Sequence, residues 1–451
     1  MKRLLLSVFA AAITAVFAVP AMATDFTFSG EYRVRGEYRG NPTFEEDDLA
    51  SSLILQRVRL TTNAQATDDT SVKITLQDSR QWGIETGSQD SGPSLTDNHS
   101  SNFTDLHESY VNVANLFDTP LSLRVGRQEF NYGDQRLIGP FGWNNNGRSF
   151  DAAKLTFSSD AADVDLFGSK INEGIDSAAP NGAGGSDDDQ DFYGIHATVK
   201  SIPNNTINVY ALLLRDGTTS QIITNNTGVI AGITSQDLYT IGARLAGNVS
   251  GLDYTLEVPF QTGSMDSTVT DYDISAWAFA AKAGYKLPTA MKIRVGAEFD
   301  WASGDDDSTD GDIETFSNLF PTNHGHYGFM DQQAWRNMMA WSVNAGIDVT
   351  EQLNLYAAYW SFSLAEDEDA WYGAGNWNHA PGSFRAASSS NTEDQVGSEI
   401  DVVANYKYNS ALAAQLGYGH FFVGDFLEQT SNLGSSAEDM DWAYLQLTAN
   451  F

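Results

Sequence analysis

Apolar and polar side chains alternate along much of this 451-residue chain, starting shortly after its N-terminal segment. In residues 25–39, Phe26, Phe28 and Tyr32 share one parity, whereas Arg33 takes the other. A period of two residues puts the two sets on opposite faces of a β-strand. Strands of about ten residues with one apolar face are typical of membrane barrels, which have lipid outside and water inside. The pattern therefore predicts membrane-spanning strands.

The alternation recurs often enough to predict an all-β fold, a transmembrane antiparallel β-barrel of about 18 strands. Short links such as 159–161 and 350–351 alternate with long ones such as 83–105 and 364–397. This predicts short periplasmic turns and long extracellular loops, with both termini in the periplasm. The strands are expected near residues 25–39, 51–64, 70–82, 106–114, 121–130, 150–158, 162–171, 190–200, 206–215, 237–248, 251–262, 273–286, 291–303, 334–349, 352–363, 398–409, 411–423 and 440–451.

The two ends of the chain predict its destination. Residues 1–23 combine Lys2 and Arg3 with an apolar stretch and a small-residue cleavage site, as a secretory signal peptide does. Residues 24–451 then form one barrel domain, and the last strand ends on the aromatic Phe451, as in bacterial outer-membrane barrels. No later apolar run reaches the roughly 18 residues of a transmembrane helix. We expect the bacterial cell outer membrane, with its lipid, lipopolysaccharide and barrel assembly machinery as partners. A soluble secreted all-β protein is the alternative.

The chain is strongly acidic, and its acidic runs fall in the expected external loops. The formal net charge is −34, and it becomes −36 when Lys2 and Arg3 leave with the signal peptide. Such runs are usually solvated. The alternative is that they bridge to anionic lipopolysaccharide through divalent cations. The runs are Glu45–Asp48, Asp187–Asp189, Asp305–Asp307 and Glu366–Asp369.

The lumen-facing parity has a different charge balance. A Debye length of roughly 8 Å screens loop carboxylates from the pore interior, so a basic wall in the lumen is expected to set selectivity. The alternative is that its arginines pair with lumen acids and hold the barrel shape. The basic wall belongs to the first six strands and contains Arg33, Arg35, Arg39, Arg57, Arg59, Lys73, Arg124 and Lys154. The opposite wall is mixed, with Arg294 among its cations and the acids Asp163, Asp165, Glu257, Glu298, Asp300, Glu399 and Asp401.

One distinctive block of the sequence runs from Gly126 to Pro140 and continues through Trp143 to Asp151. This block is the most specific of several motifs that resemble those of the alginate-export family of outer-membrane porins. The resemblance spans nearly the whole mature chain, and it implies an eighteen-stranded barrel with an arginine-lined pore for uronate polymers. The resemblance also implies that the exporter that names the family is closed from the periplasm by a long segment between strands sixteen and seventeen. In this chain that link is only about Asn409–Ser410, too short for such a plug. The other similar stretches are 319–331, 364–372, 397–401, 417–424, 78–80 and 444–447.

The block from Arg127 to Asp151 interleaves planar guanidinium groups with carboxylates. Guanidinium groups suit carboxylate ligands, and a loop with such balanced charge is expected to fold into the lumen. It serves there either as a ligand clamp or as a salt-bridged scaffold of the narrowest part. The candidate pore-lining and solute-binding residues are Arg33, Arg35, Arg57, Arg59, Lys73, Arg124, Arg127, Glu129, Asp134, Arg136, Arg148, Lys154 and Arg294.

Other chemical signals are weak. His324 and His326 could share one strand face, and residues 306–311 are similar to the start of a calcium loop, but its twelfth position is Ser317 instead of glutamate. We expect no metal and no cofactor. Residues 98–100 contain His and Ser without an arguable base or oxyanion site. We therefore expect no enzyme, with a membrane hydrolase as the alternative, and no nucleic-acid partner.

These observations together predict a passive channel for anionic solutes, such as acidic saccharides including alginate. One alternative is a general, weakly cation-preferring porin, because seven acids lie on the mixed wall. Another is a structural sleeve or adhesin barrel whose loops bind a partner. The sequence leaves open the solute, the direction of transport, the oligomeric state and divalent-cation binding by the acidic loops.

Overall fold

The computed structural model describes residues 25–44, 50–83, 104–173, 189–217, 224–225, 228–229, 233–268, 270–307, 309–374, 383–385, 388–430 and 437–451. Three predictions fall outside these residues: the signal peptide at 1–23, the acidic run at 45–48 and the tripeptide at 98–100. A fourth, the acidic run at 187–189, has only Asp189 among the described residues. They remain predictions. No helix in the described part of the chain is long and apolar enough to cross a membrane.

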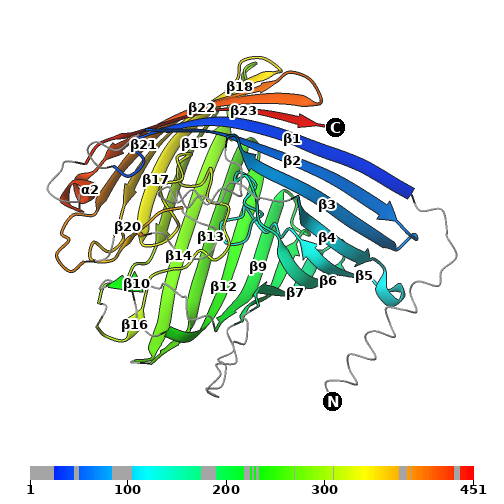
Figure 1. The fold of residues 1–451 in the computed structure, drawn as a ribbon, viewed down its shortest axis with the longest axis horizontal. Coiled ribbons are helices and arrows are strands. Elements are labelled where there is room, and N and C mark those ends of the chain that lie inside the picture. Colours follow the sequence, from blue (N-terminus) through cyan, green and yellow to red (C-terminus); the bar gives the residue numbers. More distant parts are fainter. Residues whose placement is uncertain are drawn as a thin grey trace.

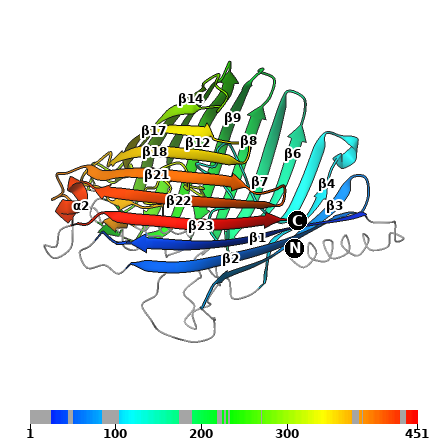
Figure 2. The ribbon, with the colours of Figure 1, turned by 90° about the horizontal axis from the view of Figure 1, so that it is seen from above.

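Within the described residues, eighteen long strands pair antiparallel in chain order and close into a barrel (Figures 1 and 2). Closure is made by β1, which pairs with β2 on one side and with β23 on the other. The prediction of an eighteen-stranded all-β barrel is confirmed. The strands are β1 (Asp25–Gly40), β2 (Ser51–Gln65), β3 (Thr70–Gln81), β4 (Asp105–Val113), β5 (Leu121–Gln128), β6 (Phe150–Ser158), β7 (Ala162–Asn172), β8 (Gln190–Val199), β9 (Asn205–Asp216), β12 (Ile233–Val249), β13 (Leu252–Ser267), β14 (Tyr272–Lys286), β15 (Arg294–Ala302), β17 (Met338–Asp348), β18 (Leu353–Ser363), β21 (Gln395–Lys407), β22 (Leu412–Val423) and β23 (Met440–Asn450).

Shorter elements lie in the connections between these strands. The two-residue strand β16 adds to β14 in parallel, and β10 pairs with β11, as β19 does with β20. The short elements are η1 (Leu116–Asp118), β10 (Thr224–Asn225), β11 (Gly228–Val229), β16 (Asp312–Ile313), β19 (Trp371–Tyr372), β20 (Ser383–Arg385) and α2 (Asp425–Thr430).

The outward face of the barrel is apolar. Phe28, Leu416 and Ile241 are 76%, 56% and 55% exposed. These fractions are far above those of apolar side chains in the core of a water-soluble protein. Each belongs to the parity opposite to a polar lumen residue of its strand, which is Arg33 for Phe28, Gln415 for Leu416 and Arg244 for Ile241. Because lipid accepts apolar surface without cost, these rows mark the wall that faces the membrane.

The connections divide the barrel into two ends. We call the end with turns such as 159–161 and 349–352 the short-turn end, and the opposite end, with connections such as 129–149 and 303–337, the long-loop end. One link at the long-loop end is short, 268–271, because β13 and β14 extend beyond their predicted limits. The link between the sixteenth and seventeenth strands, 408–411, is also short.

Candidate functional site: the barrel lumen

Two connections from the long-loop end fold into the barrel and lie side by side. We call residues 129–149 the first inward loop and residues 314–337 the second inward loop. Phe320 N donates to Leu137 O at 2.8 Å, and Gly139 N donates to Phe320 O at 2.9 Å. A Cβ atom on Gly139 would collide with Thr322 Oγ1, so glycine permits this close approach. The prediction that the 127–151 block turns inward agrees with the path of the first loop.

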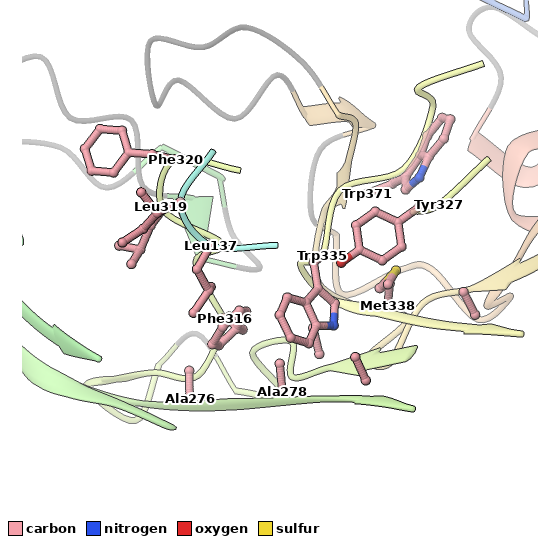
Figure 3. Close-up of a cluster of buried hydrophobic side chains, with 14 of the residues drawn as sticks. Leu137, Ala276, Ala278, Phe316, Leu319, Phe320, Tyr327, Trp335, Met338 and Trp371 are labelled. Carbon is pink, nitrogen blue, oxygen red and sulfur yellow. The ribbon is translucent and has the colours of Figure 1, made fainter. Parts of the chain in front are cut away.

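The two inward loops build an apolar core inside the barrel (Figure 3). Leu137, Phe316 and Trp335 of the loops pack over Ala276 and Ala278 of β14. The alanines point into the lumen, and both are fully covered. Burial of this apolar surface holds the loops in place, and the loops do not need to pair with a free strand edge. The long-loop half of the lumen next to β14 is therefore filled by protein.

On the basic wall, three arginines are covered by the first inward loop. Arg33 Nη1 and Arg57 Nη1 donate to Gly142 O at 2.8 and 3.1 Å. Arg35 Nη1 donates to Trp143 O at 2.8 Å, and its guanidinium lies 3.8 Å from the Trp143 ring centroid. Backbone carbonyls thus replace water around these cations.

The coverage changes what these arginines do. Arg33, Arg35 and Arg57 are lumen-facing, but they are only 5%, 2% and 3% exposed. Arg35 also pairs with Glu37 at 2.5 Å, and Arg57 pairs with Glu31 at 2.8 Å. Sequence reasoning anticipated cations that face water, because the carbonyls that cover them belong to a distant loop. Their contacts fit the alternative, in which arginines hold the interior together.

Arg136 is the centre of a buried ion cluster. Its side chain is 1% exposed, and it contacts Glu298 and Asp300, the latter at 3.0 Å. Asp134 adds a third carboxylate at 3.8 Å and also bonds Lys282 at 2.8 Å. Burial alone would raise the pKa of Asp134, but the surrounding cations hold that pKa below its usual range. Arg136 therefore ties the first inward loop to β15 and has no face open to a solute.

Glu129 and Arg148 lie at the two ends of the first inward loop. Arg148 Nη1 donates to Gly139 O at 3.1 Å and to Pro321 O at 2.8 Å, joining the two inward loops. Burial lowers the pKa of Arg148 to about 9. Glu129 accepts from His107 and Arg59, and despite the opposing effect of burial these contacts lower its pKa.

Arg127 points to the opposite side of the wall from the other candidates. It shares parity with Val125, which is 48% exposed on the outer face. Its partner is Asp151, at 3.6 Å, with side-chain exposures of 41% and 60%. The prediction of Arg127 as a pore-lining residue thus differs from its placement, because the strand continues to Gln128 before the loop turns inward.

A partly exposed basic patch remains in the lumen on β3 to β6. Lys73, Arg124 and Lys154 project inward there. Lys73 and Arg124 lie over the ring of Tyr110, and Lys154 stands opposite Arg124 on the neighbouring strand. Lys73 pairs with Glu108, and Lys154 pairs with Asp165 at 3.3 Å. In the described part of the chain, Arg124 has no carboxylate within ion-pair distance.

The remaining predicted lumen residues have partners. Arg59 contacts Gln77 at 2.6 Å and Glu129 at 3.3 Å. On the opposite side, Arg294 pairs with Asp253 at 2.6 Å, and both are about a third exposed. These pairs cancel much of the charge that the alternation pattern assigned to each wall.

Two of the predicted acidic loop runs are partly buried instead of solvated. Asp305 and Asp369 are 1% and 0% exposed. Asp369 Oδ2 accepts from Thr315 Oγ1 at 2.6 Å and from Asp305 N at 3.1 Å, so it organises the loop backbone. Burial, together with the charge of Asp369, raises the pKa of Asp305 to about 7, and burial raises the pKa of Asp369 to about 6.

The histidines considered for a metal site have other partners. His324 Nδ1 bonds Asp331 at 2.9 Å and its ring stacks on Trp143 at 3.9 Å, while His326 Nε2 bonds Asp134 O at 2.7 Å. Burial lowers the pKa of His326 to about 3. Among the described residues, no three His, Cys, Asp or Glu side chains are arranged to hold a metal.

Sequence reasoning missed the second inward loop as a lumen element. Met330 N donates to Glu399 at 3.0 Å and Phe329 N donates to Asp401 at 3.2 Å, which fixes this loop to β21. The available signal was the density of large apolar residues in a connection expected to be solvated, above all Phe316 and Trp335.

Comparisons with known proteins agree with this architecture. Residues 25–439 match the family model described as alginate export. A BenF-like porin from Pseudomonas fluorescens Pf-5 is similar over 96% of this chain and 100% of its own, with 12% identity and a TM-score of 0.59. OccK3 (OpdO) of Pseudomonas aeruginosa has 15% identity and a TM-score of 0.57, covering 95% and 96%. The outer membrane protein OprD of Pseudomonas aeruginosa has 11% identity and a TM-score of 0.57, covering 96% and 95%. None of the curated proteins matches the sequence.

Proposed function

Because the chain belongs to the alginate export family and is an outer-membrane channel, we propose that it passes small carboxylated solutes along the basic patch of Lys73, Arg124 and Lys154. The observation that carries the proposal is the state of Arg124. Its Nε lies 3.5 Å from Asn112 Oδ1 and its guanidinium 4.5 Å from the Tyr110 ring centroid. Neither neighbour neutralises its charge.

The arrangement around Arg124 suits a carboxylate group. A guanidinium group binds a carboxylate through two parallel hydrogen bonds. Tyr110 supports the cation from one face, and Asn112 offers a neutral amide beside it. Lys154 lies directly across from Arg124 on β6. Three cations against the two carboxylates of Glu108 and Asp165 leave one positive charge available to the solute.

The covered arginines contribute to the structure more than to recognition. Arg35 and Arg136 are almost inaccessible, and their donors are occupied by carbonyls and carboxylates. A solute would have to displace the first inward loop to reach them. The anion preference is therefore expected to depend on Arg124 more than on Arg57, although Arg57 lies on the same wall.

Ion selectivity tests the proposal. In a planar bilayer with a salt gradient, the unmodified channel should prefer anions, and Arg124→Gln should lower the anion-to-cation permeability ratio at least about two-fold. The matched control is Arg127→Gln, three residues along the same strand but on the outer face. The proposal fails if the unmodified channel prefers cations, or if the two variants shift the ratio equally.

A direct binding test uses galacturonate as the carboxylated probe. Galacturonate should reduce the current through the unmodified channel, and Arg124→Gln should weaken this block about ten-fold, as expected for loss of a charge-assisted hydrogen bond. Equal block of both channels would exclude Arg124 as the binding cation. A general cation-preferring porin, the second candidate because of the acids on the mixed wall, would show no galacturonate block at all.

A further inference from the structure

A cavity opens inside the barrel at the short-turn end, away from both inward loops. Its volume is about 670 Å³, and it lies beside the turns 349–352 and 408–411. Lumen-facing side chains of β18, β21, β22 and β23 line it. The residues of the basic patch are not among its lining, so it is a separate part of the lumen.

A row of neutral amides crosses this cavity. Asn354, Asn405, Gln415 and Gln446 stand on the four consecutive strands β18, β21, β22 and β23. Gln415 Nε2 donates to Asn405 Oδ1 at 2.7 Å, and the Tyr444 hydroxyl donates to Gln415 Oε1 at 2.9 Å. Asn405 Nδ2 lies 3.5 Å from Asn354 Oδ1. Gln446 stands opposite Gln415 on β23, so the four amides lie in register across neighbouring strands.

The row keeps hydrogen-bonding capacity for a ligand. Each amide offers two N–H donors and an oxygen with two lone pairs. Asn354 makes three internal contacts, and Asn405 and Gln415 make two each, so each keeps capacity for a further bond. Gln446 lies 3.4 Å from Thr448 Oγ1 and 3.4 Å from Arg35 Nη1, longer than the roughly 3.2 Å limit of a good bond. These groups can therefore exchange their weak contacts for better ones.

Charge does not dominate the cavity. The ionic side chains that line it, Lys292, Asp348, Glu351 and Lys407, lie on or beside the turns. Lys292 and Asp348 face each other at 3.7 Å with 61% and 37% of their side chains exposed. A neutral surface with both donors and acceptors is suited to hydroxyl groups, which also donate and accept.

We propose that the amide row binds the hydroxyl groups of a polyhydroxylated solute, so that the short-turn mouth recognises a saccharide independently of its charge. This inference deepens the proposed channel function and rests on it. The basic patch selects the carboxylate, and the amide row contacts the hydroxyls of the same solute at a different position along the path.

The test uses a neutral probe, so that the carboxylate site does not contribute. Maltohexaose is added separately to each side of a bilayer that holds the full-length mature channel, and interruptions of the current are recorded. Gln415→Met keeps the length of the side chain but removes its hydrogen bonds. The control is Asn63→Met, a lumen-facing amide of β2 outside the cavity.

The unmodified channel should be blocked by maltohexaose, and Gln415→Met should bind it about 3- to 10-fold more weakly, as expected for the loss of one or two neutral hydrogen bonds. Asn63→Met should behave as the unmodified channel. The inference is overturned if maltohexaose does not block the unmodified channel, or if both variants lose the block equally. Salt-gradient selectivity of the same channels reports on the proposed anion function separately, because Gln415 carries no charge.

Discussion

The two halves of the barrel interior differ in what covers the lumen-facing side chains. Toward the long-loop end, lumen-facing Ala278 and Met338 are apolar and fully covered by the inward loops. Toward the short-turn end, lumen-facing Gln415 and Thr448 are polar and border a cavity of about 670 Å³. The outer wall is apolar along both halves, so only the interior changes character.

This difference shows that strand alternation reports the lipid face more faithfully than the lumen face. Lipid requires apolar side chains at every level of the wall. The lumen face instead follows what borders it at that level, which is an open cavity in one half and a folded loop in the other. Covering Arg33 and Arg35 costs hydration, and the carbonyls of Gly142 and Trp143 offset that cost.

Arg136→Met should have the largest effect on the difference between the packed half and the open half of the barrel interior. It leaves Glu298 and Asp300 buried without their cation, and breaking a buried ion cluster typically costs about 3–5 kcal/mol. Urea unfolding of the barrel in detergent micelles should show that loss, and single-channel conductance should rise as the first inward loop detaches.

The matched control for this change is Arg127→Met, which breaks only the exposed pair with Asp151. It should cost about 1 kcal/mol or less. Equal destabilisation by the two variants would mean that the ion cluster around Arg136 does not hold the loop.

Leu137→Ala should have a smaller effect. Leu137 is 5% exposed in the core between the inward loops, and removing its side chain should destabilise the protein by about 2–3 kcal/mol. The control is Leu416→Ala on the lipid face, where 56% of the residue is exposed and lipid fills the space left behind. The same unfolding assay compares them, and a larger loss at Leu416 would contradict a packed interior.

A change of pH should have the smallest effect, confined to the long-loop end. A carboxyl group whose pKa rises on folding stabilises the fold below its unfolded pKa of about 4, and that contribution disappears as the pH passes the folded pKa. For Asp369 and Asp305 the folded values are about 6 and about 7. Amide hydrogen exchange around residues 303–307 should therefore be faster at pH 8 than at pH 5.5, after correction for intrinsic rates.

Asp305→Asn separates this effect from general acid stabilisation. The variant should remove most of the pH dependence in that segment while the exchange of β21 stays unchanged. Slower exchange at pH 8, or an unaltered pH dependence in the variant, would show that the buried carboxyls do not control this region.

How far the sequence could predict the molecule depends on which partners are local. Strand positions and count follow from a two-residue period, and the limits of β6 and β18 were predicted within one residue. The start of β17 was predicted at 334 instead of 338, because Trp335 belongs to the loop core while keeping an apolar pattern. The turn of the first loop into the lumen was predictable from its balanced charge.

The role of each arginine was not predictable in the same way. The sequence alone does not distinguish Arg124, Arg127 and Arg136. In the structure, Arg124 faces the lumen, Arg127 faces outward and Arg136 is buried among carboxylates. Those differences depend on where β5 ends and on contacts between residues more than 150 positions apart, such as Arg136 with Glu298. A two-residue pattern contains neither piece of information.

Thiol accessibility tests the central claim of a packed half and an open half most directly, because the chain has no cysteine of its own. Ala278→Cys and Thr448→Cys both place a thiol on the lumen face, the first under the inward loops and the second in the short-turn cavity. A charged, membrane-impermeant methanethiosulfonate is applied to the folded channel while its current is recorded. Rapid modification and a stepwise fall in current are expected for Thr448→Cys, with no reaction at Ala278→Cys. Equally rapid modification of both positions would contradict the division into a packed half and an open half.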